Sequence, residues 1–218
     1  MPNIHKTEIV IILDRSGSMA NIREDMEGGF KTFVDGQRKE PGDCTLSLYQ
    51  FDDRFDVVYE AKRISDVTQL ELEPRGSTAL LDAIGKTLAF VAARHDELAE
   101  ADKPAAVIVL VITDGRENAS VEWRIAGVRK AVQNAETVRN WRFVFLGADT
   151  SAFCDATSMG IGTSASYVAS PQGVRTLYAE LGSVSRSYRG RVREGDLRAR
   201  PEIKRTLTEE IDPEPEKH

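Results

Sequence analysis

The feature that most constrains the fold is an alternation of short apolar runs with longer amphipathic segments along most of the chain. Residues 7–13, 45–51, 106–112 and 141–146 are apolar runs of strand length, and stretches with helical spacing lie between them. This order is typical of a mostly parallel sheet with helices on both faces. The run at residues 106–112 contains no polar side chain, as expected of a strand that is buried on both faces. We therefore predict an α/β fold.

Helices are predicted from apolar stripes and from capping residues. Ile22, Met26 and Phe30 follow one another at four-residue spacing, which indicates a first helix. Ser170 stands directly before a proline and is the predicted N-cap of the last helix, whereas Ser120 is the predicted cap of an earlier one. The predicted helices cover residues 22–34, 80–98, 120–138, 151–158 and 170–188, and a short strand is expected at residues 166–169.

Two of the predicted strands form a hairpin. Residues 45–51 and 55–59 are separated only by Asp52, Asp53 and Arg54. Such a short connection joins antiparallel strands, because parallel strands need a much longer crossover. Asp52 and Asp53 are therefore predicted to form the turn.

The helical and strand patterns end near Tyr188. Residues 186–205 carry eight basic and three acidic side chains, and residues 206–218 carry five acidic side chains and two prolines. Both stretches are poor in apolar residues, which is typical of chain that does not pack into a core. We predict one domain at residues 1–188 and a charged, flexible tail at residues 189–218. A further turn or two of helix beyond residue 188 is the alternative.

Composition excludes several classes of protein. With 29 basic and 35 acidic residues the net charge is −6, which argues against a dedicated binder of nucleic acid or of anionic membranes. No apolar run approaches the roughly 18 residues of a membrane span, and the N-terminus does not resemble a secretory signal. Cys44 and Cys154 are the only cysteines, and we expect both to be buried thiols in a reducing compartment. The predicted location is the cytoplasm.

Oxygen-bearing side chains follow the predicted central strands. Asp14-Arg15-Ser16-Gly17-Ser18 comes directly after the first strand, and Asp114 ends the most apolar one. Thr78 stands just before the long helix at residues 80–98. Ligands of open α/β sheets bind at the carboxyl ends of strands, where the strand order reverses. Carboxylate and hydroxyl oxygens without His or Cys suit a hard cation such as Mg²⁺.

We therefore predict a metal site formed by two carboxylates and three hydroxyls. Its members are Asp14, Ser16, Ser18, Thr78 and Asp114. These five side chains leave part of an octahedral shell open for water or for a group from a partner. Without a metal the two carboxylates would repel each other, and the pKa of one of them would rise.

This set resembles the metal-ion-dependent adhesion site of von Willebrand factor type A (vWA) domains. All five motif positions are filled by the expected residue types, and the resemblance covers about residues 6–188. Small stand-alone vWA proteins of bacteria and their phages are similar to this chain in the runs VIILDRSGSM, LYQFDDRFDVVYE, PRGSTALLDAIG, VIVLVITDGRENAS and WRFVFLGAD.

The resemblance implies a Rossmann-like, doubly wound sheet of order 3-2-1-4-5-6 in which strand 3 is antiparallel. It also implies that Ser16 and Ser18 bind Mg²⁺ directly, with Mn²⁺ or Ca²⁺ as alternatives. Thr78 would join them when a ligand is engaged, whereas Asp14 and Asp114 would act largely through bridging waters. The open position would accept an aspartate or glutamate from a partner protein, whose identity the resemblance does not give.

Two other functions compete with a protein-interaction module. The first is a metal-dependent phosphoryl-transfer enzyme or hydrolase that uses Asp14 as its nucleophile. Such phosphatases need an aspartate two positions later as general acid, and that position is Ser16 here. The second is nucleic-acid binding by residues 186–205, which lack the interleaved aromatic residues of such sites. We therefore predict a non-enzymatic module and a monomer. Self-association through the acidic residues 206–218 is the alternative.

Several residues near these motifs have two interpretations. Asp82 is either an acceptor behind the metal ligands or a carboxylate that favours the first turn of its helix. Glu117 and Asn118 either contact a partner at the rim of the metal site or form a solvated turn. Gly28 and Gly29 interrupt the first helix, and we expect that close packing against a neighbouring element requires them.

Overall fold

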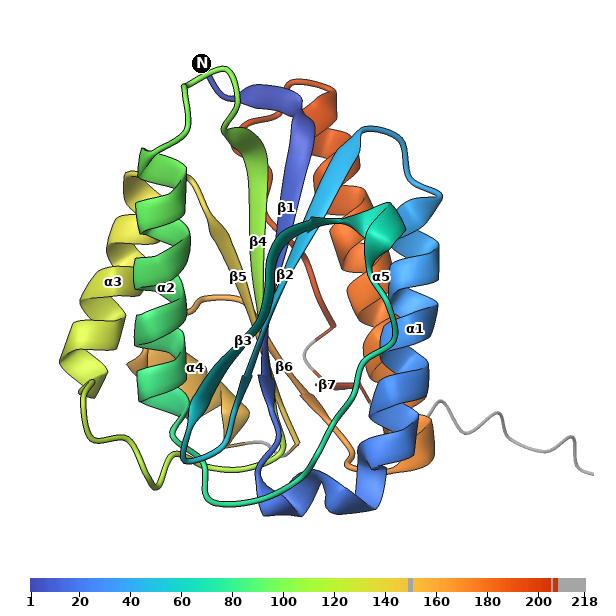
Figure 1. The fold of residues 1–218 in the computed structure, drawn as a ribbon, viewed down its shortest axis with the longest axis vertical. Coiled ribbons are helices and arrows are strands. Elements are labelled where there is room, and N and C mark those ends of the chain that lie inside the picture. The colour runs from blue at the N-terminus through green and yellow to red at the C-terminus, as the bar shows by residue number, and fades with distance from the viewer. Residues whose placement is uncertain (149–150, 205, 208–218) are drawn as a thin grey trace, which may run out of the picture.

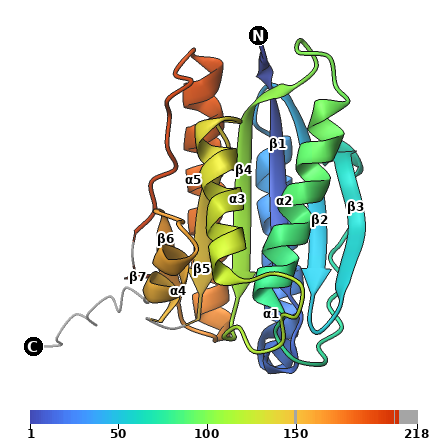
Figure 2. The same ribbon diagram turned by 90° about the vertical axis from the view of Figure 1, so that its left-hand side faces the viewer.

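A seven-stranded sheet divides the described part of the molecule into two helical layers (Figure 1). The computed structural model describes residues 1–148, 151–204 and 206–207. Helices α1 and α5 cover one face of the sheet, and α2 and α3 cover the other, as the turned view in Figure 2 also shows. The strands are β1 (Asn3–Asp14), β2 (Asp43–Phe51), β3 (Phe55–Arg63), β4 (Pro104–Thr113), β5 (Arg142–Gly147), β6 (Ser164–Tyr167) and β7 (Thr206–Leu207). The helices are α1 (Arg23–Arg38), α2 (Leu80–Asp96), α3 (Ile125–Thr137), α4 (Ala152–Ser158) and α5 (Pro171–Arg193), with 3₁₀ turns η1 (Gly17–Ile22) and η2 (Ile64–Asp66).

The predicted α/β sheet is confirmed. Its order is β3-β2-β1-β4-β5-β6, with β3 antiparallel to β2 and the other pairs parallel. The short strand β7, which the sequence does not predict, adds beyond β6. Because β1 runs towards the loop at residues 14–18, the N-terminus of the chain lies at the other end of the sheet (Figure 1).

The domain extends beyond the boundary predicted at residue 188. Helix α5 continues to Arg193, and Val192 is buried against the core. Ala199 is also buried, and its carbonyl accepts a hydrogen bond from Arg142 Nε at 2.9 Å. Residues 189–204 therefore belong to the domain and not to a tail. The acidic residues at positions 209–216 lie outside the described residues.

Two separate cores explain why the central strands are apolar throughout. Ile9, Ile11 and Leu13 of β1 point into the layer of α1 and α5, whereas Val10 and Ile12 point into the layer of α2 and α3. All five side chains are at most 1% exposed. A strand covered on both faces has no polar side, so its sequence does not alternate.

Of the adjacent glycines Gly28 and Gly29 in α1, only one is required by packing. A Cβ atom at Gly29 would lie 2.2 Å from Cδ2 of Tyr178, whereas a Cβ at Gly28 would meet nothing within 4 Å. The predicted close packing therefore applies to Gly29, which lets Tyr178 of α5 approach the α1 backbone.

These two glycines make a matched pair for mutation. We expect Gly29→Ala to lower the free energy of unfolding by about 1–3 kcal/mol, because the ring of Tyr178 must move. Gly28→Ala is expected to raise it by about 0.5–1 kcal/mol, because alanine favours the helix and fits without contact. Denaturant unfolding of both variants measures the difference, and equal effects would contradict this account.

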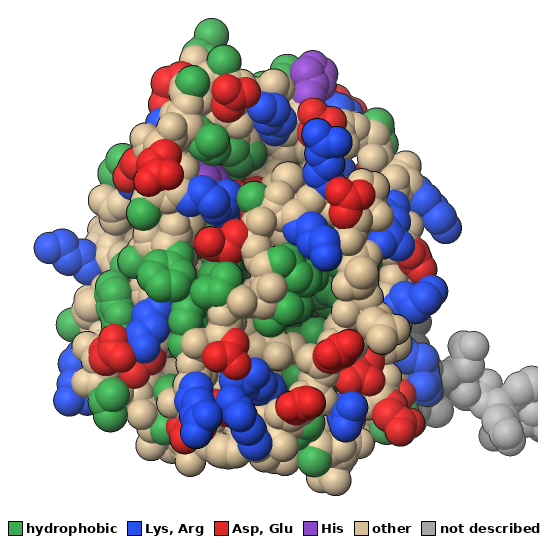
Figure 3. All heavy atoms as spheres, viewed as in Figure 1, with side chains coloured by type: hydrophobic (Ala, Val, Ile, Leu, Met, Phe, Trp, Pro, Cys, Tyr) green, Lys and Arg blue, Asp and Glu red, His purple; other side chains and the backbone are tan. Residues whose placement is uncertain are grey.

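Strand β3 forms one edge of the sheet and crosses the front of Figure 1. The same view in Figure 3 shows hydrophobic patches between charged groups on this side of the molecule. Val57 and Val58 are 43% and 46% exposed. The pairing of β2 with β3 shifts register twice, and Ala61 adopts a positive φ of 43°. Such bulges twist an edge strand and hinder the addition of another strand.

The two cysteines differ in environment. Cys44 is buried, and burial raises the pKa of its thiol to about 11. Cys154 is exposed, so the prediction that both thiols are buried is wrong for this one. Its helix, α4, spans only seven residues at the end of the sheet and does not bury this position. None of the helices in the described ranges combines the length and the hydropathy needed to cross a membrane.

Candidate metal centre

The two central strands end side by side at the lower end of the molecule in Figure 1. β1 and β4 pair in parallel up to Leu13 and Ile112, so Asp14 and Thr113 are neighbours at the carboxyl edge. The Thr113 hydroxyl donates a hydrogen bond to Asp14 Oδ2 at 2.5 Å. Because β2 continues the sheet on one side of β1 and β4 on the other, this is the point where the strand order reverses.

Hydrogen bonds link four of the five predicted site residues in series. The backbone N–H of Ser16 donates to Asp14 Oδ1 at 2.6 Å, which folds the loop back onto the strand end. Ser16 Oγ lies 3.2 Å from Ser18 Oγ, and the Ser18 hydroxyl donates to Asp114 Oδ1 at 2.6 Å. The first loop and the end of β4 therefore form one cluster of oxygen atoms.

Thr78 completes this cluster from a third loop. A Cβ atom placed on Gly115 would lie 3.0 Å from Thr78 Oγ1 and 3.7 Å from both Asp14 Oδ2 and Ser16 Oγ. Three oxygens from two loops thus surround one point beside Gly115, which belongs to a third loop and has no side chain. Thr78 is only 3% exposed, and among the described residues no hydrogen bond engages its hydroxyl. The structure brings all five predicted residues together.

No basic side chain of the described residues pairs with the carboxylates of Asp14 and Asp114. Burial raises the pKa of Asp14 to about 6, although hydrogen bonds from Thr113 and Ser16 oppose the shift and the charge of Asp114 adds to it. Burial also raises the pKa of Asp114. Neither carboxylate takes part in any ion pair found within the described residues.

This donor set fits a hard divalent cation. It consists of carboxylate and hydroxyl oxygens, and Mg²⁺ prefers such ligands. In the part of the chain that the structure describes, no three His, Cys, Asp or Glu side chains gather as they would at a zinc or calcium cage. Hydroxyls therefore supply most of the protein ligands that a cation would find here.

Comparison with solved structures identifies the fold. The sequence matches no family model and no curated protein. A structure described as von Willebrand factor type A from Catenulispora acidiphila superposes with a TM-score of 0.58 at 18% identity, covering 83% of this chain and 43% of that chain. This chain has the vWA fold. Proximal thread matrix protein 1 from the mussel byssus superposes with a TM-score of 0.55 at 20% identity, over 85% of this chain and 48% of that chain. The chain therefore spans less than half the length of either structure.

A further loop of the vWA fold fixes Thr78 and the start of α2. Helix α2 has no side-chain cap of its own, and the segment after Asp114 supplies one. Asn118 Oδ1 accepts from Thr78 N at 2.9 Å, Glu117 Oε2 from Leu81 N at 2.9 Å, and Ser120 Oγ from Asp82 N at 3.0 Å. Glu117 and Ser120 thus satisfy free N–H groups in the first turn of α2, and Asn118 holds the backbone just before that helix. Neither the rim of a partner site nor a solvated turn describes these roles.

The prediction that Ser120 caps the following helix is wrong, because its side chain binds the start of α2. Its hydroxyl donates to Glu117, and helix α3 begins only at Ile125. Asp82 holds the intervening segment, because its carboxylate accepts from the backbone N–H groups of Val121, Glu122 and Trp123 at 2.7–3.3 Å. Asp82 therefore anchors a loop and does not stand behind the predicted metal ligands.

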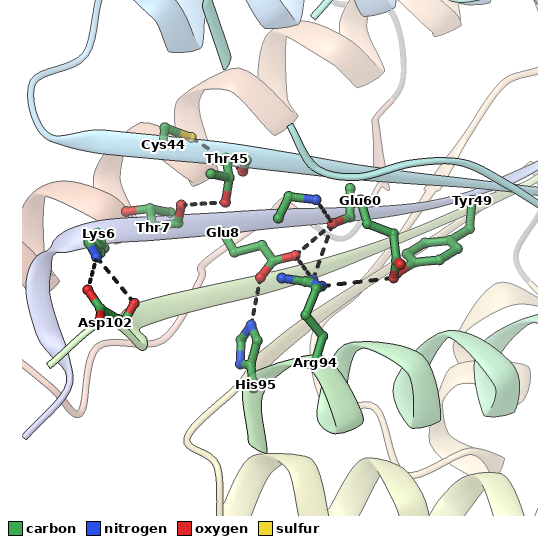
Figure 4. Close-up of polar contacts among 12 residues, drawn as sticks. Lys6, Thr7, Glu8, Cys44, Thr45, Tyr49, Glu60, Arg94, His95 and Asp102 are labelled. Atoms are coloured by element: carbon green, nitrogen blue, oxygen red, sulfur yellow. Dashed lines mark hydrogen bonds and ion pairs between the residues drawn. The ribbon is translucent and has the colours of Figure 1, made fainter. Parts of the chain in front are cut away.

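A second polar cluster lies nearer the other end of the vWA sheet, where Glu8 of β1 points towards α2 (Figure 4). Glu8 is 1% exposed. Its carboxylate accepts hydrogen bonds from Ser47 Oγ and His95 Nε2, both at 2.7 Å, and pairs with Arg94. Burial alone raises the pKa of Glu8, but the contacts with His95 and Arg94 outweigh it, so the pKa lies below its usual value. No sequence motif marks this cluster, since its members lie far apart in the chain.

Proposed function

We propose that this chain is a divalent-metal-dependent protein-interaction module that captures an acidic residue of a partner protein. The observation that carries the proposal is the convergence of Asp14, Ser16 and Thr78 oxygens on one point beside Gly115. In this proposal Asp14, Ser16, Ser18, Thr78 and Asp114 hold Mg²⁺ or Mn²⁺. The bound cation supplies an open coordination position for a carboxylate.

Access to this point supports capture of another molecule. Ser18 and the neighbouring Gly17 are exposed, as are Gly76 and Ser77 on the facing loop. The cluster therefore lies at the surface and not in a closed cavity. A side chain of a partner protein would approach it from the side of Ser18, which is exposed.

The arrangement of Asp14 favours binding over catalysis. Both of its carboxylate oxygens already accept hydrogen bonds, one from Ser16 N and one from the Thr113 hydroxyl. A carboxylate held in this way suits the orientation of a cation better than an attack on phosphorus. We accordingly propose that the chain is not an enzyme. The reducing cytoplasm is its proposed compartment, since both cysteines are free thiols.

The proposal is tested by panning a random peptide library on the immobilised chain in Mg²⁺ and eluting with EDTA. We expect the eluted peptides to be enriched in aspartate and glutamate. Thr78→Ala should weaken capture of a selected peptide by at least about tenfold, because it removes one metal ligand. Thr78→Ser keeps the hydroxyl and should retain capture.

Unfolding measurements separate this effect from a loss of structure. The backbone of Thr78 makes the hydrogen bonds to Asn118, so Thr78→Ala should leave the fold intact. A large loss of stability in Thr78→Ala would instead make the side chain a structural element. Peptides that resist EDTA, or hydrolysis of p-nitrophenyl phosphate that requires Asp14, would contradict the proposal.

A further inference from the structure

Asp52 occupies a turn but is fully buried. It connects β2 to β3, where the sequence predicts an ordinary hairpin turn, yet its side chain is 0% exposed. Oδ2 accepts hydrogen bonds from Arg15 Nε at 2.8 Å and from Arg75 Nε at 2.7 Å. Oδ1 accepts from the backbone N–H of Arg54 at 2.6 Å. One carboxylate thus joins three separate segments.

The two arginines belong to the loops that carry the metal-site hydroxyls. Arg15 stands between Asp14 and Ser16, and Arg75 is three residues before Thr78. Backbone bonds run between the same loops, from Arg75 N to Arg15 O at 2.9 Å and from Gly17 N to Gly76 O at 3.2 Å. The first and second loops of the centre are therefore held at a fixed separation.

The backbone of the turn is part of the same assembly. Arg15 N donates to Phe51 O, and Ala79 N donates to Asp52 O, both at 2.8 Å. Asp52 therefore contacts the residue after Thr78 through its carbonyl and the residue before Ser16 through its carboxylate. Asp56 also pairs with both arginines, at 2.5 Å and 3.9 Å, but its side chain is half-exposed, whereas that of Asp52 is buried.

The charges favour an ionised carboxylate at this position. Burial alone would raise the pKa of Asp52, but the hydrogen bonds from Arg75 and Arg54 N and the charge of Arg15 hold it below its usual value. Arg15 is nearly buried and also pairs with Asp56 at 2.5 Å, so it remains compensated when Arg75 is changed. Arg75 is half-exposed. It can therefore be replaced without leaving a buried charge unpaired.

We propose that Asp52 is a positioning residue for the metal centre, which sets the spacing of the Ser16 and Thr78 oxygens by binding Arg15 and Arg75 together. This inference rests on the proposed metal-dependent function. It assigns a role to three charged residues that would not touch the cation. Mutation of groups that orient metal ligands in this way typically lowers metal affinity by about 10–100-fold.

Arg75→Gln tests the proposal without disturbing the Arg15–Asp52 pair. We expect the calorimetric dissociation constant for Mn²⁺ to rise by about 10–100-fold, with the metal-free unfolding midpoint unchanged. Arg75→Lys keeps a cation near Asp52 and should recover part of the affinity, because it offers a point charge without the planar fork. Arg54→Gln is the matched control, since only its backbone binds Asp52, and it should bind Mn²⁺ like the native chain.

Hydrogen exchange of the metal-free chain gives a second readout. In Arg75→Gln the amide of Gly17, which bonds to Gly76 across the two loops, should exchange faster than in the native chain and in Arg54→Gln. Equal Mn²⁺ affinity and equal exchange in Arg75→Gln and the native chain would overturn this inference while leaving the proposed function standing. Absence of Mn²⁺ binding by the native chain would overturn the proposed function, and the positioning role with it.

Discussion

Asp14→Asn is expected to abolish the stabilisation of the fold by Mg²⁺ or Mn²⁺ and to leave the metal-free protein at least as stable as the native chain. A ligand that binds only the folded state stabilises it by about 2.7 kcal/mol when present at a hundred times its dissociation constant. Asparagine lacks the charge that attracts the cation. The native chain should therefore gain this free energy on addition of metal, and the variant should not.

The expected stability of metal-free Asp14→Asn follows from the burial of Asp14. Asp14 is 0% exposed, and its raised pKa means that the ionised carboxylate is less favourable in the fold than in the unfolded chain. Asparagine removes this cost and can still accept from Ser16 N. The Thr113 hydroxyl can then accept from the new amide and donate to the Gly115 carbonyl, which lies 3.0 Å away.

Denaturant unfolding with and without metal measures both halves. Asp102→Asn is the matched control, because Asp102 is an exposed carboxylate paired with Lys6 at the far end of the sheet. The control should respond to metal as the native chain does. An equal metal response in Asp14→Asn would remove Asp14 from the site.

Glu8→Gln should lower the free energy of unfolding by about 3 kcal/mol at pH 7, because removal of one partner from a buried ion pair strands the others. Arg94 and His95 both contact the Glu8 carboxylate, and His95 is almost fully buried. Glutamine keeps the shape but supplies no charge to either. Glu60→Gln is the control in the same cluster. Its side chain is 35% exposed, so we expect a loss below about 1 kcal/mol.

The contacts of Glu8 also determine how the free energy of unfolding changes as the pH falls. The folded-state pKa of Glu8 is lowered, so its contribution is complete above the unfolded pKa of about 4.3 and is lost as pH falls through the folded pKa. The native chain should therefore lose stability more steeply below about pH 4.3 than Glu8→Gln does. Unfolding free energies measured from pH 7 to pH 3 test this, and parallel curves would contradict it.

The parts of the fold and site that the sequence predicts correctly are those that depend on residues close together in the chain. The strands of the two cores appear as uninterrupted apolar runs, and Asp14, Ser16, Ser18 and Asp114 directly follow two of them. Parallel strands place their carboxyl ends at one edge, so these residues meet whatever the details of the loops. Thr78 precedes a strongly periodic helix, which places it at the same edge.

The supporting residues were not predictable because their roles depend on distant partners. Asp52 has the composition of a turn, and only contacts with residues 37 and 23 positions away bury it. Ser120 has the propensity of a cap, but its hydroxyl binds across to α2 and not to the helix that follows it. The charged, apolar-poor composition of residues 189–204 predicts an unpacked segment, but Ala199 packs into the core and the domain extends past residue 188.

The separation between the N-terminus and the candidate metal centre has a practical consequence for attachment. Twelve residues of β1 connect them, which is about 40 Å along an extended strand. A surface, a fluorophore or a second protein joined ahead of Met1 would therefore be held behind the domain, with the candidate metal centre facing the solution. Two copies tethered through their N-termini would present their centres outwards in opposite directions, so a single small ligand could not bridge them within one tethered pair.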